Sequence, residues 1–150
     1  MNTAWQIQSP RTQADFDALY DLRWRLLRAP WRQPRGSERD AQDASAIHAL
    51  ARHEQGELLG IARLHRLDAH CGQIRYMAVR PEWQGRGIGT ALLAWLEDRA
   101  RQEGLAEVLL NARESSVGFY RRRGYAEAGE GPVLFGTLHH RRMRKALMAS

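Results

Sequence analysis

The stretch from Gln73 to Glu103 constrains the fold more than any other part of the chain. It begins with an apolar run, Ile74 to Val79, closed by Pro81, which is typical of a buried strand because proline cannot donate to a ladder. Three glycines at alternate positions follow. From Thr90 to Gln102 the apolar residues recur at intervals of three and four, as in an amphipathic helix. The sequence therefore predicts a strand, a glycine turn and a helix in direct succession.

The glycine turn has the composition of an anion-binding site. Glycine permits positive φ and lets an anion approach backbone N–H groups, and the start of a helix adds the positive end of its dipole. The turn is not a P-loop, since Gly-Ile-Gly-Thr stands where Gly-Lys-Ser/Thr is required. It also departs from the dinucleotide fingerprint, because Thr90 takes the place of the third glycine. A different phosphate ligand is indicated.

Two segments together resemble a known superfamily. The run QGRGIG from Gln84 to Gly89 resembles the Q/R-x-x-G-x-G/A turn of the GNAT superfamily of acyl-CoA-dependent N-acyltransferases, which binds the pyrophosphate of coenzyme A. Asn111 and the run GFYRRRGY from Gly118 to Tyr125 resemble the second signature of that family, an asparagine followed by a helix ending in F-Y-x-x-x-G-F/Y. The resemblance covers roughly residues 73–126, and two motifs in order are more specific than either alone.

The resemblance implies an α/β fold, the GNAT acyltransferase fold, with a mixed central sheet of about seven strands that is splayed in the middle and flanked by about four helices. The strands ending at Val79 and Asn111 would part, and the thioester of acyl-CoA would lie between them. A chain of 150 residues, 43% of them hydrophobic, is long enough for one core, so residues 1–150 are expected to form a single domain.

The remaining elements follow from local patterns. Thr12, with Asp15 three residues later, predicts a helix start, and Ala29-Pro30 ends that helix. Polar segments rich in glycine, among them Asp68 to Gly72, are expected to be turns. Further strands are expected at residues 5–8, 46–52, 57–67, 107–111, 125–129 and 138–147, and a further helix at residues 114–123.

The resemblance also assigns roles to residues. Tyr120 would be the general acid that protonates the departing thiolate, since a phenol with a pKa near 10 is protonated at neutral pH and comparable in basicity to a thiolate. Without the upstream motif, Tyr120 would be read as a core aromatic residue. The residues expected to bind acetyl-CoA include strand positions whose backbone pairs with the pantetheine arm like an added strand; they are Met77, Ala78, Val79, Gln84, Gly85, Arg86, Gly87, Ile88, Gly89, Thr90, Asn111 and Phe119.

The general base is not evident from the sequence. Several members of the superfamily carry a glutamate at the position of Gln73, and an amide cannot take up a proton at neutral pH. Three histidines and one glutamate could take the place of that glutamate as the base; they are His65, His139, His140 and Glu114. Each of these side chains is more often structural or solvent-exposed than catalytic. A water chain ending on one of them is equally compatible. Cys71 is not expected to carry the acyl group, because no histidine partner is evident near it in the sequence.

The loop from Pro30 to Asp40 contains two prolines, one glycine and several arginines. In the resembled fold this connection borders the acceptor, so Trp31, Arg32 and Arg35 are candidates for binding it. A solvated arginine-rich loop with one packed tryptophan is an equally simple interpretation.

Taken together, the sequence predicts an enzyme that moves an acetyl group from acetyl-CoA to an amine of a small molecule or peptide, without a metal. A non-catalytic acyl-CoA-binding sensor or interaction module is the alternative. The net charge of +6 and five tryptophans raise nucleic-acid binding as a distant third, but the amphipathic pattern places Trp95 on an apolar helix face. With one cysteine and no apolar run of membrane-spanning length, the chain is expected to be cytoplasmic. Homodimerisation stays open.

Overall fold

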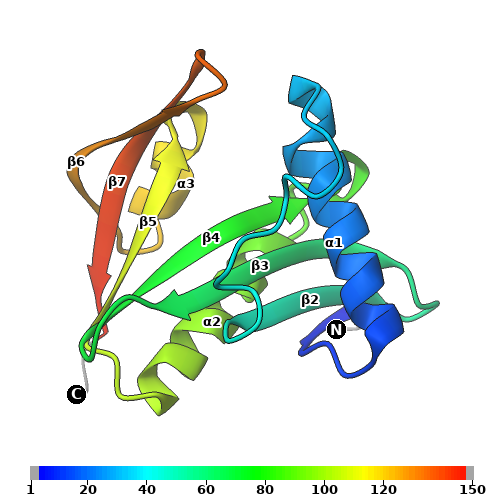
Figure 1. The fold of residues 1–150 in the computed structure, drawn as a ribbon. Coiled ribbons are helices and arrows are strands. Elements are labelled where there is room, and N and C mark those ends of the chain that lie inside the picture. The colour runs from blue at the N-terminus through cyan, green and yellow to red at the C-terminus, as the bar shows by residue number, and fades with distance from the viewer. Residues whose placement is uncertain (1–3, 148–150) are drawn as a thin grey trace. The chain divides into compact units, whose positions relative to one another are not determined.

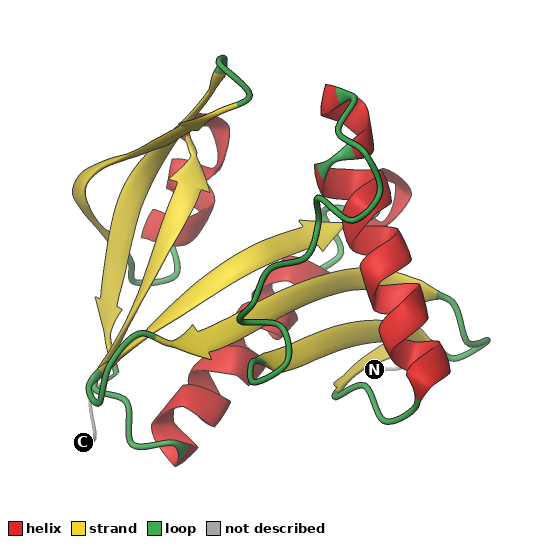
Figure 2. Cartoon of the chain, viewed as in Figure 1, coloured by secondary structure: helices red, strands yellow, loops and turns green. Residues whose placement is uncertain are grey.

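The structure is a computed structural model that describes residues 4–147, and it is a mixed α/β fold built on one seven-stranded sheet (Figures 1 and 2). The strand order is β1-β2-β3-β4-β5-β7-β6, with β4 and β5 parallel. The elements are β1 (Trp5–Gln8), α1 (Gln13–Leu27), β2 (Ile47–His53), β3 (Leu58–Arg66), β4 (Cys71–Val79), α2 (Ile88–Gln102), β5 (Glu107–Arg113), α3 (Val117–Arg121), β6 (Ala126–Leu134) and β7 (Leu138–Ala146).

The chain divides into two compact units. The first contains the described residues up to His65 together with Tyr76–Leu96, and the second contains Arg66–Arg75 together with the described residues from Glu97 onward. Within residues 4–147, no helix is long and apolar enough to cross a membrane.

Helix α1 begins where local chemistry predicts. The side chain of Thr12 accepts the N–H of Asp15 at 3.1 Å, and the carboxylate of Asp15 accepts the N–H of Thr12 at 3.3 Å, so the two residues form a reciprocal capping box. The helix then buries Leu19 and Leu22 against Leu50 of β2 and neighbouring apolar side chains. This packing fixes α1 on one face of the sheet in the first unit.

The opposite face of the same strands carries the start of α2, which lies behind them in Figure 1. The close approach requires a glycine. A Cβ atom at Gly60 of β3 would lie 3.1 Å from the carbonyl oxygen of Ala78 and 3.2–3.3 Å from side-chain atoms of Leu92 and Ile88. Because those neighbours are backbone or fully buried side chains, a larger residue would force the helix away from the sheet.

In the second unit the sheet continues through strands that are distant in sequence. Strand β4 pairs in parallel with β5 over Cys71–Ile74 and Glu107–Leu110, and β5 pairs antiparallel with β7 along its whole length. The parallel register ends at Ile74 and Leu110, although both strands continue beyond those residues. The parallel pairing of the two central strands is therefore confined to the first four residues of each.

Three expected boundaries were wrong. Cys71 and Gly72 belong to β4 rather than to a turn, because their pairing with β5 extends the strand toward its beginning. Strand β6 runs to Leu134 rather than ending near residue 129, since its partner β7 stabilises polar residues of weak strand propensity. The helix expected at residues 114–123 is divided into a 3₁₀ turn, Glu114–Ser116, and the five-residue α3; the other 3₁₀ turns are Ala29–Trp31 and Pro81–Trp83.

Candidate functional site

The glycine turn connects β4 to α2 in the first unit. Gly85 and Gly87 both have positive φ, 76° and 86°, which side-chain-bearing residues rarely adopt. No atom outside the turn lies within 4 Å of a Cβ built on either glycine, so the space in front of this backbone is open. The N–H of Ala91 donates to the carbonyl of Gly87 at 3.0 Å, which begins the helical hydrogen bonding of α2. The earlier N–H groups of the helix therefore point out from its positive end.

Neighbouring side chains hold the turn in place. The amide nitrogen of Gln84 donates to the carbonyl of Val79 at 3.2 Å, which ties the turn to the end of β4. The guanidinium of Arg86 lies 4.5 Å from the centre of the Trp83 ring, which in turn packs against His53 at 5.2 Å. Arg86 is exposed, so its charge remains available to an anion at the turn.

The last residues of β4, Met77 to Val79, were predicted to present their backbone to pantetheine. They are partly buried and follow Tyr76, whose φ of 58° is unusual for a residue with a side chain. A left-handed residue in a strand turns the backbone that follows it, and such positions cluster at functional sites. The left-handed residue Tyr76 therefore lies directly before the three β4 residues that the sequence predicts to bind pantetheine.

In the second unit, Asn111, Phe119 and Tyr120 lie on β5 and α3. The Oδ1 atom of Asn111 is buried and has no hydrogen-bond partner among the described residues. A buried acceptor without a donor destabilises the protein by about 1–3 kcal/mol, so this atom is suited to an incoming N–H group. The ring of Tyr120 packs edge-on against Phe119 at 5.1 Å and against Tyr125 at 5.8 Å.

The phenol of Tyr120 has an altered acidity. Burial raises the pKa of Tyr120 to about 12, and the positive charge of Arg113 opposes this rise only in part. The same burial lowers the pKa of Arg113, while the phenol partly offsets that effect. Tyr120 is therefore fully protonated at any physiological pH, as a proton donor must be.

The structure shows which contacts the candidate bases make. Nη2 of Arg63 lies 3.1 Å from Nδ1 of His65, and because arginine can only donate, His65 accepts there and carries its proton on Nε2. Nδ1 of His140 lies 3.0 Å from the carbonyl oxygen of Pro132, at which this ring nitrogen must donate. Glu114 is exposed in a 3₁₀ turn, and Gln73 lies in the part of β4 that pairs with β5.

The loop arginines differ from each other. Arg35 donates to Asp21 at 2.7 Å, and its guanidinium stacks 4.1 Å above the ring of Trp24. Arg32 is exposed and ends the 3₁₀ turn Ala29–Trp31, with a φ of 57°. Arg35 thus packs against Trp24 of α1, and Trp31 is partly buried within the 3₁₀ turn.

Two buried polar clusters were not anticipated. In the second unit, Glu97 accepts hydrogen bonds from Tyr125 and Lys145. In the first unit, Asp43 accepts from Arg23 and Arg63, which are 1% and 0% exposed. A signal existed for the second cluster, since Arg63 interrupts an otherwise apolar run from Leu58 to Leu64, and a fully buried charge requires a partner.

Cys71 is buried at the start of β4. Burial raises the pKa of its thiol to about 11, and the charges of Glu107 and Asp68 act in the same direction. Within residues 4–147, no group of three or more His, Cys, Asp and Glu side chains is arranged to hold a metal ion.

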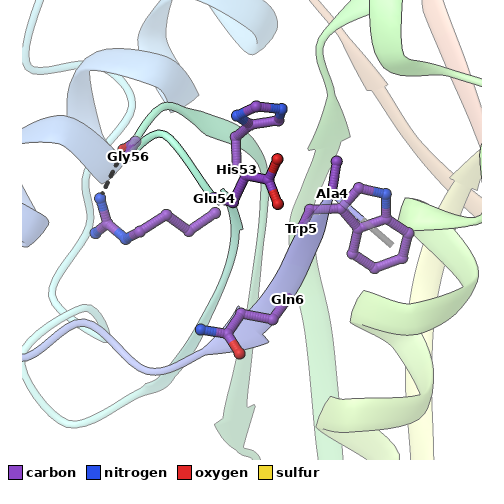
Figure 3. A pocket seen from close by; sticks show the side chains of 7 residues that line it. Ala4, Trp5, Gln6, His53, Glu54 and Gly56 are labelled. Carbon is purple, nitrogen blue, oxygen red and sulfur yellow. Dashed lines mark hydrogen bonds between the residues drawn. The ribbon is translucent and has the colours of Figure 1, made fainter. Parts of the chain in front are cut away.

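A pocket lies at the edge of the first unit, where β1 meets the β2–β3 turn (Figure 3). Its wall includes Trp5, His53 and Glu54, and the guanidinium of Arg52 donates to the carbonyl of Gly56 at 2.8 Å. None of its lining residues belongs to the predicted site.

Comparisons with known proteins identify the family to which the chain belongs. The sequence profile of the acetyltransferase (GNAT) family matches residues 16–125, and the chain belongs to this family. Solved structures share the fold: a suspected N-acetyltransferase from Lactobacillus plantarum is 22% identical, covers 97% of this chain and 100% of its own, and has a TM-score of 0.84.

Two further structures of the same fold contain coenzyme A or its acetyl form. An aminoglycoside 6'-N-acetyltransferase complexed with coenzyme A is 18% identical, with 97% and 98% of the two chains covered and a TM-score of 0.80. A GNAT family acetyltransferase from Elizabethkingia anophelis with acetyl-CoA bound is 19% identical, with 97% and 99% covered and a TM-score of 0.73.

Proposed function

We propose that this protein transfers an acetyl group from acetyl-CoA to an amine of a small molecule or peptide. The observation that carries the proposal is the glycine turn, whose positive-φ backbone lies open at the start of α2 in a chain of the acetyltransferase (GNAT) family. Convergent N–H groups and the positive helix end stabilise a pyrophosphate without a lysine. Arg86, exposed beside the turn, adds a positive charge.

Other residues are suited to the pantetheine arm. The backbone of Met77, Ala78 and Val79 would pair with its amides, and the orphaned Oδ1 of Asn111 would accept one of its N–H groups. Gln84, Ile88, Gly89 and Thr90 complete the turn and the first helical residues, while Phe119 would pack against the arm. When bound, acetyl-CoA supplies the activated acetyl group as a thioester.

Tyr120 protonates the departing thiolate in this proposal. A phenol whose pKa is about 12 is a weak acid toward a thiol whose ordinary pKa is about 8.5. Burial, however, also makes a thiolate more basic. Cys71 illustrates the size of this effect in the same protein, since its pKa is raised to about 11. A thiolate released in a similarly dry environment would match Tyr120 as a proton acceptor.

The test measures coenzyme A binding by calorimetry and amine-dependent thiol release for the wild type and for Gly87→Val. The valine side chain should occupy the open space in front of the turn and lower affinity for coenzyme A at least tenfold. Gly104→Val is the matched control, because Gly104 also has positive φ and open space but follows the end of α2.

Three outcomes would contradict the proposal. Unchanged coenzyme A affinity in a folded Gly87→Val variant would refute the site, and equal affinity for NADH and ATP would indicate a nonspecific anion site. Coenzyme A binding without thiol release across a broad panel of amines would indicate an acyl-CoA sensor.

A further inference from the structure

Buried charges hold the loop between α1 and β2 against the first unit. Oδ1 of Asp43 accepts hydrogen bonds from Nη1 of Arg23 at 2.9 Å and from Nη1 of Arg63 at 3.1 Å. The side chain of Asp43 is only 3% exposed, and Arg23 also donates to the carbonyl of Glu38 at 3.1 Å. Because both arginines are buried and share one carboxylate, this part of the cluster fixes the position of the loop.

Asp40 lies at the solvent-facing end of the same cluster. Its Oδ1 accepts from Nη1 of Arg63 at 2.6 Å and from the N–H of Gln42 at 2.9 Å, and its Oδ2 lies 3.3 Å from the hydroxyl of Tyr76. Its side chain is 27% exposed. Hydrogen bonds therefore hold the Asp40 carboxylate in place, and the exposed part of the side chain is accessible to a ligand from solvent.

The contact with Tyr76 places Asp40 beside the strand that the proposed function assigns to the acetyl donor. Tyr76 directly precedes Met77 on β4, and its left-handed backbone turns the strand at this point. All of these residues belong to the first unit, as does the glycine turn. An amine that contacts Asp40 would therefore lie near Tyr76 and the β4 backbone that follows it, which the proposed function assigns to acetyl-CoA.

We propose that Asp40 is the general base that the chain lacks at Gln73, and that it binds the ammonium form of the acceptor and takes up its proton; this inference depends on the proposed acetyltransferase function. Gln73 cannot take up a proton, and Nδ1 of His65 is engaged by Arg63. An aspartate can serve as the general base of an enzyme, as in ketosteroid isomerase.

The proton transfers balance. Asp40 removes one proton from the ammonium group and releases it to water, and the freed nitrogen lone pair forms the C–N bond with the thioester carbon. When the C–S bond breaks, Tyr120 gives its proton to the thiolate sulfur. The second proton lost by the nitrogen then restores Tyr120. The sum is an amide, a thiol and one released proton, as acetylation of an ammonium requires.

The charged and titratable groups around Asp40 come from each neighbouring element. They are Arg63 and His65 on β3, Tyr76 on β4, Asp43 in the loop, and Arg23 and Arg28 over the Tyr76 ring, at 4.2 Å and 5.5 Å from its centre. Arg63 is the one among them that donates directly to the Asp40 carboxylate, at 2.6 Å.

The experiment compares the pH dependence of kcat/KM for the acceptor in the wild type and in Asp40→Asn. The wild type binds the ammonium form, so its kcat/KM should be nearly flat between about pH 6 and 8.5, below the ammonium pKa of a lysine-like amine. Asp40→Asn can use only the free amine, so its kcat/KM should fall about 10²–10⁴-fold at neutral pH and rise tenfold per pH unit. Coenzyme A affinity should stay unchanged.

Two further variants keep the test decisive. Asp17→Asn, on the exposed face of α1, should behave as the wild type. Asp40→Glu retains a carboxylate and should keep the flat profile, and it tests the inference even if the asparagine variant does not fold. A steep profile in Asp40→Glu, or a flat one in folded Asp40→Asn, would overturn the role of Asp40. Absence of transfer by the wild type to any amine would instead refute the proposed function.

Discussion

The phenol of Tyr125 donates a hydrogen bond of 2.8 Å to Oε2 of Glu97, and both side chains are buried. The other carboxylate oxygen of Glu97 accepts from Lys145 at 2.9 Å, and Lys145 also donates to the carbonyl of Arg123. Three segments of the second unit therefore meet at one carboxylate: the C-terminal part of α2, the turn that directly follows α3, and β7. Since α3 carries Tyr120, this cluster stabilises the element on which the proposed proton donor lies.

Removing the Tyr125 hydroxyl should destabilise the protein. We expect Tyr125→Phe to lower the free energy of unfolding by about 1.5–3 kcal/mol, because a hydrogen bond to a buried carboxylate is lost. Burial, together with the charge of Glu97, raises the pKa of Tyr125, so the unfolded chain loses this proton first as the pH rises. The stability difference between the two proteins should therefore shrink above about pH 10. Urea unfolding at pH 8 and at pH 10.5 measures it, and a constant difference would contradict this account.

Asp43 should have the opposite pH dependence. Burial by itself would raise its pKa, but the N–H of Asp40 and the Arg23 guanidinium outweigh burial, so the pKa of Asp43 lies below its ordinary range. Its stabilising effect is therefore present above about pH 4 and is lost as the pH falls further. Asp43→Asn should cost about 3–5 kcal/mol at pH 7, because it leaves buried arginine charge uncompensated. Denaturant unfolding at pH 7 and below pH 4 should show that the difference narrows in acid.

Tyr120→Phe should affect turnover rather than binding. The phenylalanine ring keeps the contacts with Phe119 and Tyr125 and removes the donor alone. We expect kcat to fall about 10²–10⁴-fold, equivalent to roughly 3–5 kcal/mol of transition-state stabilisation. Coenzyme A affinity should barely change. Wild-type single-turnover rates in a folded variant would refute the assignment, since single turnovers report chemistry even when product release limits kcat.

Substitutions of Arg32 and Arg35 should have different effects, one on the acceptor KM and the other on stability. Arg32→Ala should raise KM for an acceptor that carries a carboxylate and leave KM for acetyl-CoA nearly unchanged. Arg35→Ala should instead lower stability by up to about 1 kcal/mol, because its exposed ion pair with Asp21 and its stacking on Trp24 are weak contacts. Steady-state kinetics and thermal unfolding distinguish the two effects. A raised acetyl-CoA KM in Arg32→Ala would place the loop on the donor side.

The sequence predicted those features that depend on residues close together in the chain. The capping box of Thr12 and Asp15 spans four residues, and the strand, glycine turn and helix follow one another directly. Such local patterns restrict backbone angles wherever they occur, so they can be read without knowledge of the tertiary structure.

The buried clusters could not be predicted in the same way. Tyr125 and Glu97 are 28 residues apart, and Arg23 and Asp43 are 20 residues apart, so nothing in a local pattern pairs them. Asp40 was overlooked for the same reason: in the sequence it is one polar residue of a loop, and its significance arises when folding brings it to Arg63 and Tyr76. Strand β6 was cut short because pairing with β7, not propensity, determines its length.

The burial of Cys71 should make the protein slow to react with thiol-specific reagents. Burial raises the pKa of this thiol to about 11, so it is protonated at pH 7, and the sulfur is also shielded from solvent. As Cys71 is the single cysteine of the chain, aromatic disulfide reagents added continuously during turnover should develop colour with free coenzyme A alone. The protein can thus be assayed in real time without a cysteine-free variant, and oxidation during storage should not cross-link it.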